Sequence, residues 1–272
     1  MGTLDWTRSF ADAGPLQTVG LTGVLLPVTP DFNAEFGVAR GLNAAGRLSL
    51  LLADTDIDFV VAGGDSRSWR VGGSMARNLL PELVAYGEVA WLSEENRLLV
   101  DPLTGRALRL GEAALSAVAG LRWQAPTDTT VLLEYYRNGP GVTAQQFADA
   151  VRLIDAAADA QALDGGSGPA LAARQVAARV TRSYQRPQPL RDYVYLRVSQ
   201  REPRNILYTT PAISFIVDPV GGSASVTPEI VYTGFTNTEL RLRTQVNVGA
   251  TDTDFGSRQV NARVELRARV FF

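Results

Sequence analysis

The sequence predicts an all-β protein with antiparallel strands, and three observations support this. The carboxyl end alternates strictly between apolar and polar residues. About 13 candidate strands can be placed along the 272 residues. The connections between them mostly alternate between short and long. We therefore expect residues 1–272 to form a single domain of roughly 12–14 strands.

The carboxyl-terminal segment 260–272 has one apolar and one charged face. The apolar positions are Val260, Ala262, Val264, Leu266, Ala268, Val270 and Phe272. The polar positions are Asn261, Arg263, Glu265, Arg267 and Arg269. This alternation of apolar and polar residues with a period of two predicts a β-strand with one apolar face and one charged face. Its length exceeds the usual soluble strand of about 5–6 residues and suits a tilted bilayer crossing of about 9–11.

The same alternation recurs at 239–248, which we expect to pair with 260–272 as a hairpin. The other candidate strands are 4–11, 17–25, 46–53, 56–64, 68–78, 81–94, 113–124, 128–138, 191–202, 205–217 and 223–234.

Connection lengths decide between the possible β architectures. The long connections are 26–45, 95–112 and 139–190, and most of the intervening turns span only two or three residues. The turn at 65–67 is short where this scheme expects a long loop. Short periplasmic turns and long extracellular loops are typical of a transmembrane β-barrel, whereas a soluble sandwich has no reason to sort its loops in this way. The sequence therefore favours an antiparallel transmembrane β-barrel.

The long loop 139–190 contains a predicted α-helix near 143–158. Thr143 and Gln146 have the spacing of a capping box. Apolar residues follow at helical spacing, namely Phe147, Val151, Ile154 and Ala158. This stripe either docks the loop onto the barrel rim or folds the helix inward as a constriction.

The composition excludes several kinds of chemistry. The chain has no Cys and no His, so it contains no Ser-His-Asp triad, thiol nucleophile or His-based zinc site. All 26 positive charges are Arg against 28 acidic residues, which predicts no nucleic-acid partner. Asp54, Asp56 and Asp58 resemble the opening of a calcium loop, but no Gly follows at the required place, so a short turn is favoured. We expect no catalytic, cofactor or metal site, and no enzyme activity.

At the level of its strand pattern the chain resembles Gram-negative outer-membrane β-barrels of the porin-like type. The resemblance is specific only at the carboxyl end. There it implies an assembly signal, recognised by the barrel assembly machinery, made of Phe272, Val270, Ala268, Leu266 and Val264. It also implies an outer-membrane location in contact with lipid, with Phe272 at the periplasmic rim and the long loops outside the cell.

The same resemblance implies an even number of strands and a cleaved signal peptide. The amino end shows no signal peptide. We therefore expect either the carboxyl-terminal part of a longer precursor, lacking one or more strands, or one misassigned amino-terminal strand. Aromatic residues near strand ends fit interfacial girdles, namely Trp69, Trp91, Trp123, Tyr193 and Phe272.

In such a barrel the polar face of each strand lines the lumen. The expected pore-lining residues are Arg197, Glu229, Glu239, Arg241, Arg243, Arg263, Glu265, Arg267 and Arg269, with Arg70, Glu88, Arg122 and Glu134 on other strands. Guanidinium groups around a water-filled passage would concentrate anions. Alternatively, Arg and Glu pair across neighbouring strands as salt-bridge ladders that add little net potential.

These features favour a passive outer-membrane pore for small hydrophilic solutes, with a mild preference for anions. The alternative is a non-catalytic scaffold or export component whose lumen is filled. A soluble all-β binding protein is a third reading, in which the apolar faces would form a core. Solute identity and self-association into a homo-oligomer are left open by the sequence.

Overall fold

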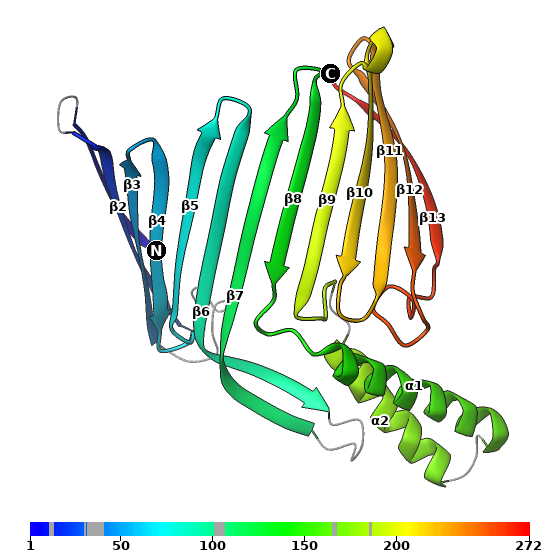
Figure 1. Ribbon diagram of the computed structural model, residues 1–272. Coiled ribbons are helices and arrows are strands. Elements are labelled where there is room, and N and C mark those ends of the chain that lie inside the picture. The colour runs from blue at the N-terminus through cyan, green and yellow to red at the C-terminus, as the bar shows by residue number, and fades with distance from the viewer. Residues whose placement is uncertain (11–13, 30, 32–40, 101–106, 165–167, 185–186) are drawn as a thin grey trace. The chain divides into compact units, whose positions relative to one another are not determined.

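The computed structural model describes the backbone of residues 1–10, 14–29, 31, 41–100, 107–164, 168–184 and 187–272, and the side chains of these except 95–100, 107–111, 164 and 182–184. Its thirteen strands follow one another in chain order within one sheet, and the described strand pairs are antiparallel (Figure 1). The all-β, antiparallel prediction and the expected strand number are confirmed. The strand order has two ends, β1 and β13, so the sheet is not closed, and the strand number is odd where the resemblance implies an even one.

The strands agree closely with those expected from the sequence. They are β1 (Gly2–Ser9), β2 (Leu16–Val28), β3 (Gly41–Leu52), β4 (Thr55–Gly64), β5 (Arg70–Leu80), β6 (Leu83–Val100), β7 (Ala107–Gln124), β8 (Thr129–Arg137), β9 (Asp192–Gln200), β10 (Thr209–Asp218), β11 (Ser223–Phe235), β12 (Thr238–Val248) and β13 (Ala262–Val270). One prediction is wrong: the long loop at 95–112 is mostly strand, because β6 and β7 continue into it.

The chain divides into two compact units. The first comprises Met1–Asn96 and Gly111–Leu121, and the second comprises Arg97–Leu110 and Arg122–Phe272. This division does not decide the prediction of a single domain.

In the first unit, β1 to β6 form a ladder of hairpins. The turn between β3 and β4 shows how tightly they are joined. Ala53 and Asp54 both have positive φ, 48° and 58°, and Leu52 pairs with Thr55. Two central residues with positive φ define a type I′ turn, whose twist matches that of the strands it joins. The short turn expected near Asp54 is therefore present.

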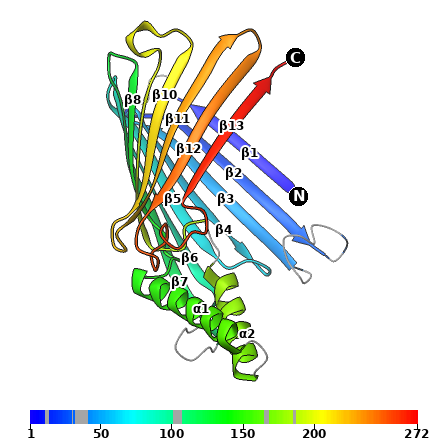
Figure 2. The same ribbon diagram turned by 90° about the vertical axis from the view of Figure 1, so that its right-hand side faces the viewer.

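In the second unit, β8 to β13 form a second ladder of hairpins. The turn between β11 and β12 has Asn237 at φ 52°, and the amide of Phe271 donates to the carbonyl of Asn237 over 2.8 Å. The carboxyl terminus therefore lies at the same end of this unit as the β11–β12 turn and the β9–β10 connection 201–208. The longer connections, including 138–191 and 249–261, lie at the other end (Figure 2).

Two helices, α1 (Ala144–Asp164) and α2 (Gly168–Tyr184), lie at the long-loop end of the second unit and pack against each other (Figures 1 and 2). The predicted capping box is present: the Gln146 amide donates to Thr143 Oγ1 over 3.1 Å, and the Thr143 amide donates to Gln146 Oε1 over 2.9 Å. The helix at 143–158 is confirmed and extends further. The second helix was not expected.

A small core lies where this helical segment meets the strands. Phe147 and Ala150 of α1 pack with Val142, Leu190 and Phe255, all buried. Phe255 comes from the β12–β13 connection, so this core joins the two largest loops of the second unit.

Candidate functional site

The polar face of β8 to β13 brings together the charged residues that alternation assigns to a lumen. Arg197 of β9 lies opposite Ser214 of β10, and Glu229 of β11 lies opposite Arg243 of β12. Every second residue of a strand points to the same face. This parity places the nine expected pore-lining residues of β9, β11, β12 and β13 on one face, and Glu134 of β8, opposite Tyr195, joins them.

Glu229 is the centre of the ion pairs on this face. Its carboxylate accepts a hydrogen bond from Arg197 Nη2 at 3.1 Å and lies 3.7 Å from Arg241 Nη1. The Glu229 side chain is only 8% exposed, while those of Arg197 and Arg241 are about one-third exposed. The Glu229 carboxylate thus forms ion pairs with guanidinium groups on two different strands, and both guanidinium groups remain partly accessible to water.

Two other carboxylates on this face are also bound by Arg. Glu265 lies 2.9 Å from Arg267 and 3.5 Å from Arg263, and Glu239 lies 3.3 Å from Arg241. These pairs run mostly along a strand, so only part of the expected cross-strand ladder is present.

Arginine outnumbers its partners on β9 to β13. Six Arg and three Glu lie on this face, and among the described residues Arg243 and Arg269 form no ion pair. An ion-pair network is therefore present on this face and leaves an excess of arginine on β9 to β13, while a wall that concentrates anions stays a prediction.

The first unit has its own polar face. Arg47 of β3 forms a bidentate ion pair with Asp58 of β4. Its Nε donates to Oδ1 over 3.0 Å, and its Nη2 donates to Oδ2 over 2.9 Å. Asp58 lies opposite Ser74, which in turn lies opposite Glu88. The same parity puts Arg70 on this face, while the face occupied by Arg122 of β7 stays a prediction.

The opposite face of each unit is apolar and uncovered. In the second unit Leu242 lies opposite both Ile230 and Leu266, and the exposed fraction of Leu266 is 77%. In the first unit Phe59 lies opposite Leu48 and is 51% exposed. Water-soluble chains rarely leave a contiguous apolar face of this kind open.

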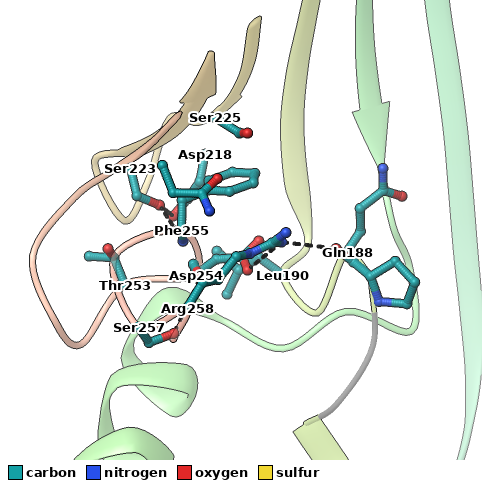
Figure 3. A network of polar contacts seen from close by, with 12 residues as sticks. Gln188, Leu190, Asp218, Ser223, Ser225, Thr253, Asp254, Phe255, Ser257 and Arg258 are labelled. Atoms are coloured by element: carbon teal, nitrogen blue, oxygen red, sulfur yellow. Dashed lines mark hydrogen bonds and ion pairs between the residues drawn. The ribbon is translucent and has the colours of Figure 1, made fainter. Parts of the chain in front are cut away.

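The end of the polar face near α1 holds a buried polar network, and Figure 3 shows the part of it around Asp254 and Arg258. Tyr193 of β9 donates from its hydroxyl to Asp254 Oδ2 over 2.8 Å, and Arg258 donates to Asp254 Oδ1 over 3.0 Å. The Arg258 guanidinium also lies 4.5 Å from the centre of the Phe255 ring. Tyr193 is 2% exposed, so its assignment to an aromatic girdle is wrong: it points to the polar face and joins the rim core.

Burial raises the pKa of the Asp254 carboxyl above its usual value. The hydrogen bond from Tyr193 and the charge of Arg258 act in the opposite direction and only partly compensate. Removing water from a carboxylate disfavours its charged form, which explains the sign.

Sequence reasoning did not identify this rim network. Tyr193 lies about sixty residues before Asp254 and Arg258, and no local pattern joins it to them. Asp254 and Phe255 lie in a Thr/Asp/Gly-rich loop without apolar periodicity. The helix cap at Thr143 was the one signal that marked this end of the unit.

No protein-family model matches the chain, and no curated protein is significantly similar to it. Neither of the two described helices is both long enough and apolar enough to cross a membrane. Within the described part of the chain, no cluster of three or more acidic side chains is arranged to hold a metal ion.

Proposed function

We propose that this chain forms the wall of an outer-membrane β-barrel pore for the passive diffusion of small hydrophilic solutes, with a mild preference for anions. The observation that carries the proposal is the pairing of an uncovered apolar face with a charged face on strands of mostly 8 to 13 residues. In a bilayer the apolar face meets lipid, and the backbone must be satisfied by strand pairing because lipid offers no other partner. The outer edges of β1 and β13 are not paired with each other, so a barrel requires that they pair with each other or with further strands.

The excess of arginine on β9 to β13 supports the anion preference. The side chains of Arg263 and Arg267 are 68% and 49% exposed, so their charge is accessible from the water side of the sheet. A positively charged wall attracts anions and repels cations at short range. The assigned partners are outer-membrane lipid, the barrel assembly machinery and small polar or anionic solutes.

A second candidate is a non-catalytic scaffold or export component with a filled lumen. One observation favours it: α1 and the β12–β13 connection pack together at one end of the polar face through Phe147 and Phe255. Such packing narrows the route along that face.

Conductance in planar bilayers separates the two candidates. The full chain is refolded in detergent, its β-structure is verified by circular dichroism, and it is added to one chamber. Stepwise current increments support the pore. Folded, membrane-inserted protein that carries no current overturns the pore and favours the scaffold. A chain that stays folded and monodisperse in buffer without detergent overturns both.

A further inference from the structure

The second unit has a cavity of about 760 Å³ between α1 and the polar face of β12 and β13. One wall is apolar and comes from the helix, with Phe147, Val151 and Ile154. The facing wall is polar, with Gln245 of β12 and Arg263 of β13. Small-molecule sites usually have this size and combine an apolar wall with a few polar groups.

A smaller recess of about 60 Å³ adjoins the cavity on its polar side. Arg243, Gln245, Arg263 and Glu265 line it, so two of its residues are shared with the larger cavity. The guanidinium-bearing residues Arg243 and Arg263 therefore both line this recess.

These two guanidinium groups are available to a ligand. Arg243 forms no ion pair among the described residues, and the side chain of Arg263 is 68% exposed. The single ion pair of Arg263, with Glu265 at 3.5 Å, competes with the closer contact of Arg267 to the same carboxylate.

The other charged residues at the cavity determine how a bound ligand is oriented. Arg258 is engaged by Asp254 and lies over the Phe255 ring. Asp155 lies on the helix side of the cavity, where its charge repels an anion. The carboxylate of Glu265 also lines the recess, but it pairs with Arg267 at 2.9 Å, so the β12–β13 wall keeps a net positive charge. An anionic group is therefore directed to this wall, and an apolar group to the helix wall.

We infer that this cavity binds a small amphipathic monocarboxylate, whose carboxylate lies between Arg243 and Arg263 and whose apolar body packs on Phe147, Val151 and Ile154. This inference deepens the proposed function, since it names the class of solute that the mouth of the pore would retain. Charge-assisted hydrogen bonds to guanidinium supply recognition of the head, and burial of the body supplies the rest.

Fluorine NMR on the full chain in lipid nanodiscs tests the inference with three probes. 4-Fluorobenzoate has both the charge and the body, 4-fluorobenzyl alcohol has only the body, and trifluoroacetate essentially only the charge. We expect saturable line broadening for 4-fluorobenzoate alone, above that seen with empty nanodiscs. The double substitution Arg243→Gln and Arg263→Gln should weaken it about tenfold or more.

Two further variants keep the test specific. Ile154→Ala, on the apolar wall, should weaken 4-fluorobenzoate binding about threefold to fivefold. Arg201→Gln removes one positive charge from an exposed turn away from the cavity and should leave binding unchanged. Equal broadening by all three probes, or an equal loss with Arg201→Gln, overturns the inference.

Conductance distinguishes failure of the site from failure of the proposed function. A conducting protein that does not bind 4-fluorobenzoate overturns the site and leaves the pore intact. A protein that binds the probe as expected but carries no current overturns the pore and leaves the site intact.

Discussion

In the register of β12 and β13, Arg243 lies directly opposite Glu265, yet the two do not form an ion pair. The Glu265 carboxylate is bound instead by its own-strand neighbours Arg263 and Arg267. The guanidinium of Arg243 is consequently left without a counter-charge among the described residues. Strand register alone would have predicted a neutral pair at this position.

The assignment of the two faces predicts opposite tolerance to charge. Leu240, Leu242, Val264, Leu266 and Val270 are expected to contact lipid. Replacing Leu266 with Arg should destabilise the folded protein by about 2–4 kcal/mol if it lies near the bilayer midplane. Urea unfolding in lipid vesicles measures this cost.

The matched control is Glu265→Arg on the opposite face of the same strand. It places a third cation between Arg263 and Arg267, but water screens the repulsion, so its cost should be clearly smaller than that of Leu266→Arg. Equal costs at both positions would remove the basis for assigning one face to lipid and the other to water.

The carboxyl-terminal Phe272 is expected to act in assembly rather than in packing. The backbone amide of its neighbour Phe271 donates a hydrogen bond to the Asn237 carbonyl, while the Phe272 side chain is exposed. Deleting Phe272 should therefore reduce the amount of folded protein in cell envelopes more than it reduces refolding in detergent. Unchanged envelope levels, measured by surface proteolysis, would argue against an assembly signal.

The rim core should depend on Phe255. This residue is 2% exposed and packs with Val142, Leu190 and Phe147. Phe255→Ala should cost about 3–5 kcal/mol of local stability, because the surrounding residues cannot close the space. Hydrogen exchange should accelerate in 249–261 and at the start of α1, and β10 and β11 should keep their protection. Uniform loss of protection in the second unit would mean that the rim is not a separate packing unit.

How far the sequence predicts this structure depends on the range of the interactions. The β12 and β13 alternation is local, so their strands and faces could be predicted from residue order. The extension of β6 and β7 was missed because polar residues such as Glu95 and Arg109 suggested a loop, although strand pairing uses the backbone whatever the side chains are. Likewise α2 was missed after the glycine-rich stretch, yet the spacing of Ala170, Ala177 and Val180, all buried, is helical.

The features of the candidate site also divide into those that local sequence predicts and those that depend on long-range contacts. Parity along a strand is enough to assign Arg241 or Arg267 to the polar face. Parity cannot reveal which guanidinium keeps a counter-charge, since that depends on which of several carboxylates lies closest. The cavity beside α1 required the fold of a fifty-residue loop, which no local signal supplies.

Acidification should stabilise the rim through Asp254. Its raised pKa means that the folded chain keeps this proton to a higher pH than the unfolded chain, whose usual value is 3.8. The contribution is therefore complete below that value and is lost as pH rises through the raised pKa.

The comparison of wild type with Asp254→Asn isolates this effect from that of other carboxylates. Protection of 249–261 against hydrogen exchange, corrected for intrinsic rates, should favour the wild type more at acidic than at neutral pH. A difference that is constant or grows with rising pH would contradict the raised pKa.

The last prediction concerns ion selectivity. On β9 to β13 the polar face has three more Arg than Glu, and the charges of Arg243 and Arg269 are not paired among the described residues. Reversal potentials across a salt gradient should therefore show a mild anion preference. It should be strongest at low salt, because physiological salt screens charges beyond about 8 Å.

Replacing Arg241, Arg243 and Arg267 with Gln should weaken this preference, because it removes three positive charges and leaves the three glutamates in place. The matched control is Arg201→Gln, which lies in a turn and pairs with Asp128 at 3.6 Å. Its reversal potential should equal that of the wild type. If the wild type prefers cations, the arginine excess does not face the conducting path. If Arg201→Gln shifts the potential as much per removed charge as the triple variant does, only the total charge of the protein matters, and the assignment of this face to the lumen fails.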